Sequence, residues 1–175
     1  MSTSFIDIKR REAQYRENRV RDFRDVEVRP SLEEVKIQAS RCMNCGVPFC
    51  HAYGCPLGNM IPDVHQAVLE GRMRDAYKIF NKTSPFPEFT SRVCPALCES
   101  ACCANLASGA VTIKQIEFAV IENAFEMGYV SENPPAFRSG SRVAVVGSGP
   151  SGLAIADALN KMGHEVVVFE KSLCA

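Results

Sequence analysis

The chain has 175 residues, of which 46% are hydrophobic, and its 20 lysines and arginines balance its 20 aspartates and glutamates. This balance leaves no net field that would favour nucleic acid or an anionic membrane as a partner. Residues 1–29 lack the apolar core of a signal peptide, and no segment approaches the roughly 20 apolar residues of a membrane-spanning helix. We therefore expect a cytoplasmic protein that has a core for one domain and begins a second.

The first predicted helix follows an irregular arm over residues 1–30. Ser31 and Glu34 form a capping box, in which a serine and a glutamate three residues later satisfy free backbone N–H groups. This pattern predicts a helix over residues 32–41. Residues 46–58 hold three glycines and two prolines, so we expect a loop wrapped around a bound group.

Two short helices are predicted next. Pro62 suits the first turn of one helix, which would stop at Gly71. The second helix covers residues 73–81, where apolar side chains recur at helical spacing. Residues 84–87, Ser-Pro-Phe-Pro, are expected to break the chain again.

A further helix is predicted to start at Pro95, because proline fits the first helical position. Cys94, Cys98 and Cys102 would then share one side of about two turns. Cys103 would point roughly 100° away from them.

Eight of the nine cysteines fall into two groups, and these groups are the most direct indication of chemistry. In a reducing compartment, clustered cysteines are metal ligands or catalytic groups more often than disulfides. Short-spaced thiolates with a following proline are typical of iron–sulfur clusters. Cys102 and Cys103 are adjacent, so only seven of the eight cysteines are well spaced. Two four-ligand sites would need one ligand more than these seven provide. The two groups are Cys42, Cys45, Cys50 and Cys55, and Cys94, Cys98, Cys102 and Cys103.

A longer helix is predicted over residues 112–127, with Gly128 after its end. Glu117 points into the middle of the apolar side of this helix. A buried carboxylate is costly without a partner, so Glu117 needs a cation, a donor or a metal. Two interpretations stay open: Glu117 extends to solvent from the rim or pairs with an arginine, or Glu117 is the missing eighth ligand.

A dinucleotide-binding signature follows a polar connector over residues 131–141. Gly147, Gly149 and Gly152 lie between a predicted strand and a helix, and Glu170 ends the next strand. In such units the glycines admit the diphosphate and the acidic residue binds a ribose. A carboxylate repels a 2′-phosphate, so the site suits FAD or NAD(H) rather than NADP(H).

The chain resembles the small (beta) subunit family of NADPH-dependent glutamate synthase, whose helical domain is shared with dihydropyrimidine dehydrogenase. The most specific stretches are residues 41–51, 54–59, 81–98, 111–117 and 143–152. The resemblance implies a mainly α fold, with a helical, alpha-helical ferredoxin-like domain for two [4Fe-4S] clusters over residues 1–138. The start of an FAD-binding Rossmann domain, truncated after one βαβ unit, would occupy residues 139–175.

The resemblance also implies roles for individual residues. One cluster would be bound by Cys42, Cys45, Cys50 and Glu117, and the other by Cys55, Cys94, Cys98 and Cys102. The FAD fingerprint is matched by Gly147, Gly149, Pro150, Ser151, Gly152 and Glu170. No residue is assigned to nucleophilic catalysis, and no special role is assigned to His51, His65 or His164.

By resemblance, the chain is part of an oxidoreductase subunit. NADPH would reduce FAD, and the two clusters would pass electrons to FMN in a large (alpha) subunit, where 2-oxoglutarate and glutamine yield glutamate. The remaining FAD site and the NADPH domain are missing after residue 171, so we expect a truncated chain that does not turn over alone. Two alternatives remain: a module of another flavin oxidoreductase, of the dihydropyrimidine dehydrogenase or ferredoxin:NADP type, or a zinc-binding interaction module.

Overall fold

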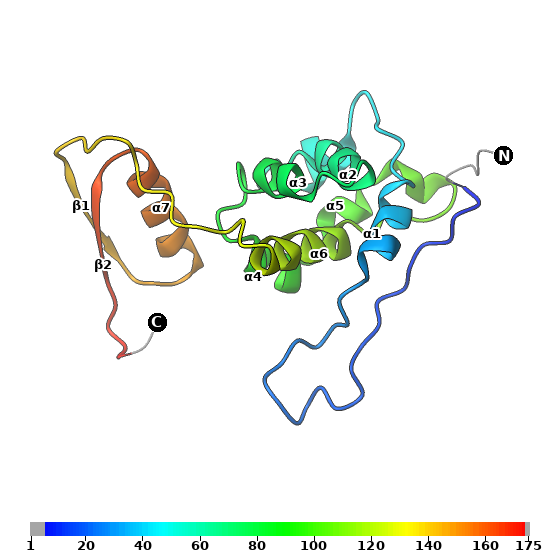
Figure 1. The fold of residues 1–175 in the computed structure, drawn as a ribbon, viewed down its shortest axis with the longest axis horizontal. Helices are drawn as coiled ribbons and strands as arrows, with labels where there is room; N and C mark the ends of the chain where they lie inside the picture. Colours follow the sequence, from blue (N-terminus) through cyan, green and yellow to red (C-terminus); the bar gives the residue numbers. More distant parts are fainter. Residues whose placement is uncertain (1–5, 174–175) are drawn as a thin grey trace. The chain divides into compact units, whose positions relative to one another are not determined.

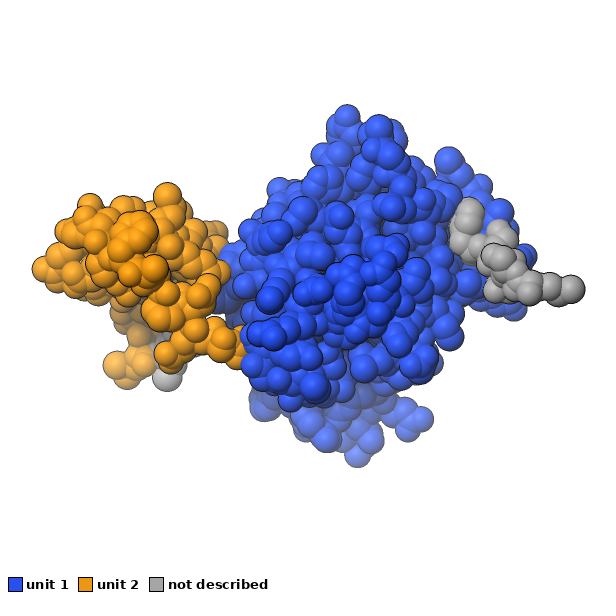
Figure 2. All heavy atoms as spheres, turned by 45° about the horizontal axis from the view of Figure 1, so that its top comes forward, with its two compact units in different colours: residues 1–129 blue, residues 130–175 orange. Residues whose placement is uncertain are grey.

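The computed structural model describes residues 6–173 and divides the chain into two compact units, residues 1–129 and residues 130–175 (Figure 2). The first unit is helical, and the second holds a parallel two-stranded sheet and one helix. This confirms a mainly α fold followed by a βαβ unit. Within residues 6–173, no helix has the length and apolar character needed to cross a membrane.

Helix α6 is the centre of the first unit, because it contacts each of the other five α-helices (Figure 1). It is buried along most of its length, and Ile113, Ile116 and Val120 belong to the main apolar core. Val64 and Val68 of α2 and residues of α1 and α3 complete this core. The helices are α1 (Leu32–Ala39), α2 (Ile61–Leu69), α3 (Met73–Phe80), α4 (Pro87–Val93), α5 (Leu97–Ser100) and α6 (Ile113–Glu126), with a π-helical turn η1 (Cys50–Gly54) and a 3₁₀ turn η2 (Cys103–Leu106).

The predicted start of the first helix is confirmed. The Ser31 side chain accepts a hydrogen bond from the Glu34 N–H at 3.2 Å, and the Glu34 carboxylate accepts one from the Ser31 N–H at 2.8 Å. Both bonds of the capping box are therefore present. The predictions for α2, α3 and α6 are also confirmed, and Gly128 after α6 has a φ of +66°.

Two expectations about the segment between α3 and α6 are wrong. Residues 84–87 do not only break the chain, because Pro87 begins helix α4. The two-turn helix from Pro95 does not form: Ala96 takes a left-handed conformation with a φ of +56°, and the helix that follows has only four residues. Cys102 lies after this helix in extended backbone, so the three cysteines do not share one helix side.

Turn η1 and helix α5 approach each other very closely at Gly54. A Cβ atom added to Gly54 would lie 2.7 Å from the Cα atom of Cys98 and 2.9 Å from the Cβ atom of Ala101. No side chain fits in this space, so glycine is required here for steric reasons. The contact places Cys55, the next residue, beside the turn that carries Cys98.

The second unit has the predicted βαβ arrangement. Strands β1 (Arg142–Val146) and β2 (Glu165–Phe169) are parallel, and helix α7 (Pro150–Lys161) connects them. Gly147 turns the chain between β1 and α7 with a φ of +98°. A side chain at Gly152 would collide with the carbonyl oxygen of Gly147, so the helix can start this close to the strand only with glycine.

Candidate metal centre

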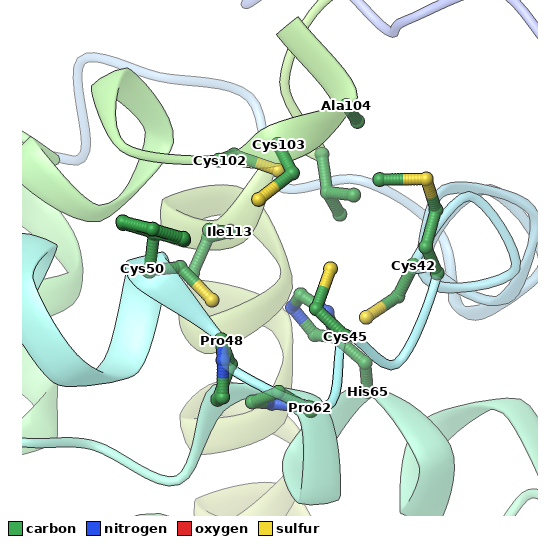
Figure 3. Close-up of a pocket in the computed structure, with 13 residues that line it drawn as sticks. Cys42, Cys45, Pro48, Cys50, Pro62, His65, Cys102, Cys103, Ala104 and Ile113 are labelled. Atoms are coloured by element: carbon green, nitrogen blue, oxygen red, sulfur yellow. The ribbon is translucent and has the colours of Figure 1, made fainter.

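Five cysteines line one pocket, which we call the first thiol pocket. Figure 3 shows their sulfur atoms turned toward the same space. The pocket has about 360 Å³ between protein atoms, including space open to solvent, and its other lining residues are mostly apolar. The five are Cys42, Cys45, Cys50, Cys102 and Cys103.

A buried arginine holds the two sides of this pocket together. Arg41 directly precedes Cys42 and is fully buried. Its guanidinium donates hydrogen bonds to the carbonyl oxygens of Ser108, Gly109 and Ala110 at 2.6–2.8 Å. Hydrogen bonds to a charged group contribute about 1.5–3 kcal/mol each. Arg41 therefore fixes the loop that follows Cys102 against the end of α1.

Burial makes the thiols of the first pocket hard to ionise by themselves. It is the main cause that raises the pKa of Cys42 and Cys45, and it raises that of Cys50 to about 12. The Cys102 thiol adds to the increase at all three, whereas Cys103 acts on Cys45, with which it forms a hydrogen bond. Of the two adjacent cysteines, Cys102 is therefore the one whose thiol affects the pKa of Cys42, Cys45 and Cys50 alike.

His65 of α2 also lines the first thiol pocket (Figure 3). Its side chain is 2% exposed, and burial lowers its pKa to about 4, so the ring is neutral at pH 7. Neither ring nitrogen has a hydrogen-bond partner among the described residues. Sequence reasoning gave this residue no role, because nothing in the local pattern of α2 reveals which groups surround it.

Cys55, Cys94 and Glu117 lie near Cys98, and we call these four residues the second ligand group. Burial is the main cause that raises the pKa of Cys98, and the nearby Glu117, Glu99, Cys55 and Cys94 add to the increase. The N–H of Asn59 donates to the Cys55 sulfur at 3.4 Å. The N–H of Ala96 donates to the Cys94 sulfur at the same distance.

Glu117 lies inside the unit, as the sequence predicted. It is 8% exposed, and burial raises its pKa to about 7. Among the described residues, no ion pair joins it to a basic side chain. The Asn59 side chain donates a hydrogen bond to its carboxylate at 3.2 Å, and Asn59 in turn accepts one from the Thr83 hydroxyl at 2.8 Å. The interpretation in which Glu117 lies at the rim or pairs with an arginine is therefore not what the structure shows.

The two sets of ligands differ from those that the resemblance implied. Cys102 lies with Cys42, Cys45 and Cys50, not with Cys55, Cys94 and Cys98. Glu117 lies with the second set and not with the first. The reason is that the helix expected from Pro95 does not form. Helix α5 ends at Ser100, and the extended backbone at Cys102 carries that thiol away from Cys98.

We call Cys42, Cys45, Cys50 and Cys102 the first set and the second ligand group the second set. Each set offers four thiol or carboxylate donors, which is the chemistry that an iron–sulfur cluster requires. Ligation needs deprotonated thiols, so binding a metal centre would release protons at the buried cysteines. In residues 6–173, no three His, Cys, Asp or Glu side chains are arranged to hold a single metal ion.

The glycine turn of the predicted dinucleotide-binding signature lies in the second unit, between β1 and α7. Gly149 precedes α7, and Pro150, Ser151 and Gly152 form its first turn. Glu170 accepts hydrogen bonds from the N–H and hydroxyl of Ser148 at 2.9 and 2.8 Å and from the N–H of Ser172 at 2.9 Å, and these bonds lower its pKa to about 2. The carboxylate is therefore charged at neutral pH and lies beside the glycine turn.

Comparisons with known proteins agree with these features. Residues 19–129 match the family described as dihydropyrimidine dehydrogenase domain II, 4Fe-4S cluster, and residues 145–173 match the NAD(P)-binding Rossmann-like domain. The chain is 51% identical over 153 residues to the glutamate synthase [NADPH] small chain of Mycobacterium tuberculosis, covering 87% of this chain and 31% of the relative. It is 43% identical over 180 residues to the small chain of Bacillus subtilis, covering 97% and 36%.

The glutamate synthase [NADH] of Schizosaccharomyces pombe is 44% identical over 171 residues, which are 96% of this chain and 8% of that protein. The chain thus spans about a third of the length of the two small chains. The predicted resemblance to small chains of glutamate synthase is confirmed. From its match over residues 19–129, the chain belongs to the dihydropyrimidine dehydrogenase domain II, 4Fe-4S cluster family.

Proposed function

We propose that this chain is an electron-transfer component of a glutamate synthase, in which two [4Fe-4S] clusters carry electrons toward a large subunit that contains FMN. The observation that carries the proposal is the separation of the ligands into two sets within one helical unit. The 51% identity to a glutamate synthase [NADPH] small chain supports the choice of partner. Glutamate formation from 2-oxoglutarate and glutamine would then occur in the large subunit.

Iron–sulfur clusters, when bound, supply one-electron transfer with little change in structure. The residues of this chain hold the ligands still for that purpose. Arg41 fixes the loop after Cys102, and Asn59 fixes both Cys55 and Glu117 through its backbone and side chain. Fixed ligands reduce the rearrangement that accompanies each electron transfer.

The second unit would bind the ADP part of FAD. The glycine turn, the N-terminus of α7 and the charged Glu170 suit a diphosphate and a ribose without a 2′-phosphate. NADPH would bind to a domain that these 175 residues do not include. We place this function in the cytoplasm, without a membrane or nucleic acid as partner.

The proposed function is tested by mixing the anaerobically reconstituted, dithionite-reduced chain with the FMN-containing large subunit of a glutamate synthase. We expect brown protein with about eight iron atoms per chain and rapid bleaching of the flavin absorption. The protein without iron is the control. A colourless zinc protein would contradict the cluster assignment, and iron-loaded protein that never reduces the flavin would contradict the partner.

The choice between adjacent cysteines gives a second prediction. Cys102 and Cys103 line the same pocket, but Cys102 contributes to the raised pKa of Cys42, Cys45 and Cys50, whereas Cys103 contributes to that of Cys45. We therefore expect Cys102→Ala to lose about half of the iron. The matched variant Cys103→Ala should keep its iron. Equal iron content in the two variants would show that the choice of Cys102 is wrong.

The assignment of Glu117 to the second set gives a third prediction. Glu117→Leu should lose about half of the iron, and the double variant with Cys42→Ala should lose nearly all of it, because the two changes affect different clusters. Glu122 lies on the same helix as Glu117 and forms an ion pair with Arg92 of α4. The variant Glu122→Leu is the control and should keep its iron. A double variant that loses no more iron than either single variant would place Glu117 with the first set.

A further inference from the structure

His65 is a buried polar side chain that the function proposed above does not yet use. Buried donors and acceptors in folded proteins nearly always have a partner. Yet both ring nitrogens of His65 lack one among the described residues. Two neighbouring buried side chains differ from it only in part: Arg41 Nε and Thr112 Oγ1 also lack a partner among the described residues, but the other nitrogens of Arg41 donate to three carbonyl oxygens. In His65 both polar atoms of the side chain are left without one. The missing partner of His65 therefore calls for a ligand.

The surroundings of His65 restrict what this partner can be. The pocket that it lines contains apolar side chains, such as Pro62, Val111 and Ile113, and five cysteines. The side-chain acceptors in this pocket are therefore sulfur atoms. A neutral imidazole carries one N–H donor in either tautomer, and the tautomer decides which of the two ring nitrogens donates.

We propose that His65 donates an N–H hydrogen bond to an inorganic sulfur atom of the cluster in the first thiol pocket. The inference rests on the proposed function, because it requires a cluster between these cysteines. His65 acts here as a positioning residue that tunes the cluster and not as one of its ligands.

The physical consequence is a higher reduction potential for this cluster. Reduction adds one negative charge, which spreads over the iron and sulfur atoms. A donor aimed at sulfur stabilises the reduced form more than the oxidised form, and hydrogen bonds to sulfur are among the factors that set cluster potentials. A rigid helix supplies this donor, since His65 lies within α2 between the core residues Val64 and Val68.

The test compares three variants in the reconstituted chain. His65→Leu removes the donor, whereas His65→Asn and His65→Gln each keep an N–H group close to the position of one ring nitrogen. The readout is a redox titration followed by electron paramagnetic resonance, and the signal of the first cluster is the one that Cys42→Ala abolishes.

At the wild-type midpoint potential, His65→Leu should lower the ratio of reduced to oxidised first cluster about fivefold, the size expected for one hydrogen bond. At least one of the amide variants should restore the wild-type ratio, and the second cluster should not change in any variant. Equal shifts in all three variants would show that His65 only packs, and full iron content without any shift would also overturn the proposal.

A measurement on the unmodified sequence covers the case in which His65→Leu does not fold. With ¹⁵N-labelled histidine, pulsed paramagnetic resonance of the reduced first cluster should detect a weakly coupled ring nitrogen. The coupling should persist in His51→Gln, which controls for the histidine next to Cys50. Loss of the coupling in His51→Gln, or its absence from protein with full iron content, would overturn the proposal. Absence of iron from the wild-type chain would instead contradict the proposed function.

Discussion

The arrangement of both ligand sets depends on the close contact between η1 and α5. Cys50 and Cys55 are only five residues apart, yet Cys50 lies in the first thiol pocket and Cys55 lies beside Cys98. The π-helical turn between them closes with a hydrogen bond from the Cys55 N–H to the Cys50 carbonyl oxygen at 2.9 Å. Gly54 then brings the backbone against Cys98, where any side chain would collide. Two groups of cysteines can thus be separated by a single turn.

The packing of the helical unit explains how such polar groups are tolerated inside it. Helix α6 supplies the apolar surface on which the other helices pack, and it carries Glu117 into the interior. Arg41 and Asn59 use their hydrogen bonds on backbone carbonyls, a cysteine sulfur and the Glu117 carboxylate. The bonds from Arg41 to Ala110 and from Asn59 to Glu117 join segments that lie more than 50 residues apart. The positions of the proposed ligands therefore depend on the folded state of the whole unit.

The sequence predicted those features that depend on neighbouring residues. The capping box at Ser31, the burial of Glu117 and the glycine turn at Gly147 are local patterns with a definite geometric meaning, and each is present. Helix α4 is not among the predicted elements. Two prolines in residues 84–87 indicate a chain break, although proline is also favoured at the first helical position, where Pro87 lies.

Features that depend on distant contacts could not be predicted in this way. The helix expected from Pro95 is absent because Ala96 takes a left-handed backbone conformation, for which the sequence has no signal. Without that helix, Cys102 lies beside Cys42, Cys45 and Cys50, which a local pattern could not predict. The roles of Arg41 and His65 were also missed. Arg41 binds a carbonyl oxygen 69 residues away, and the pocket around His65 combines residues 42–62 with residues 102–113, which only the fold brings together.

The most direct test of the two-set arrangement is anomalous diffraction at the iron absorption edge from crystals grown without oxygen. The account predicts two separate iron peaks. One should lie among Cys42, Cys45, Cys50 and Cys102, and the other among Cys55, Cys94, Cys98 and Glu117. A single peak, a signal at the zinc edge alone, or Cys102 bound to the same iron site as Cys98 would contradict it.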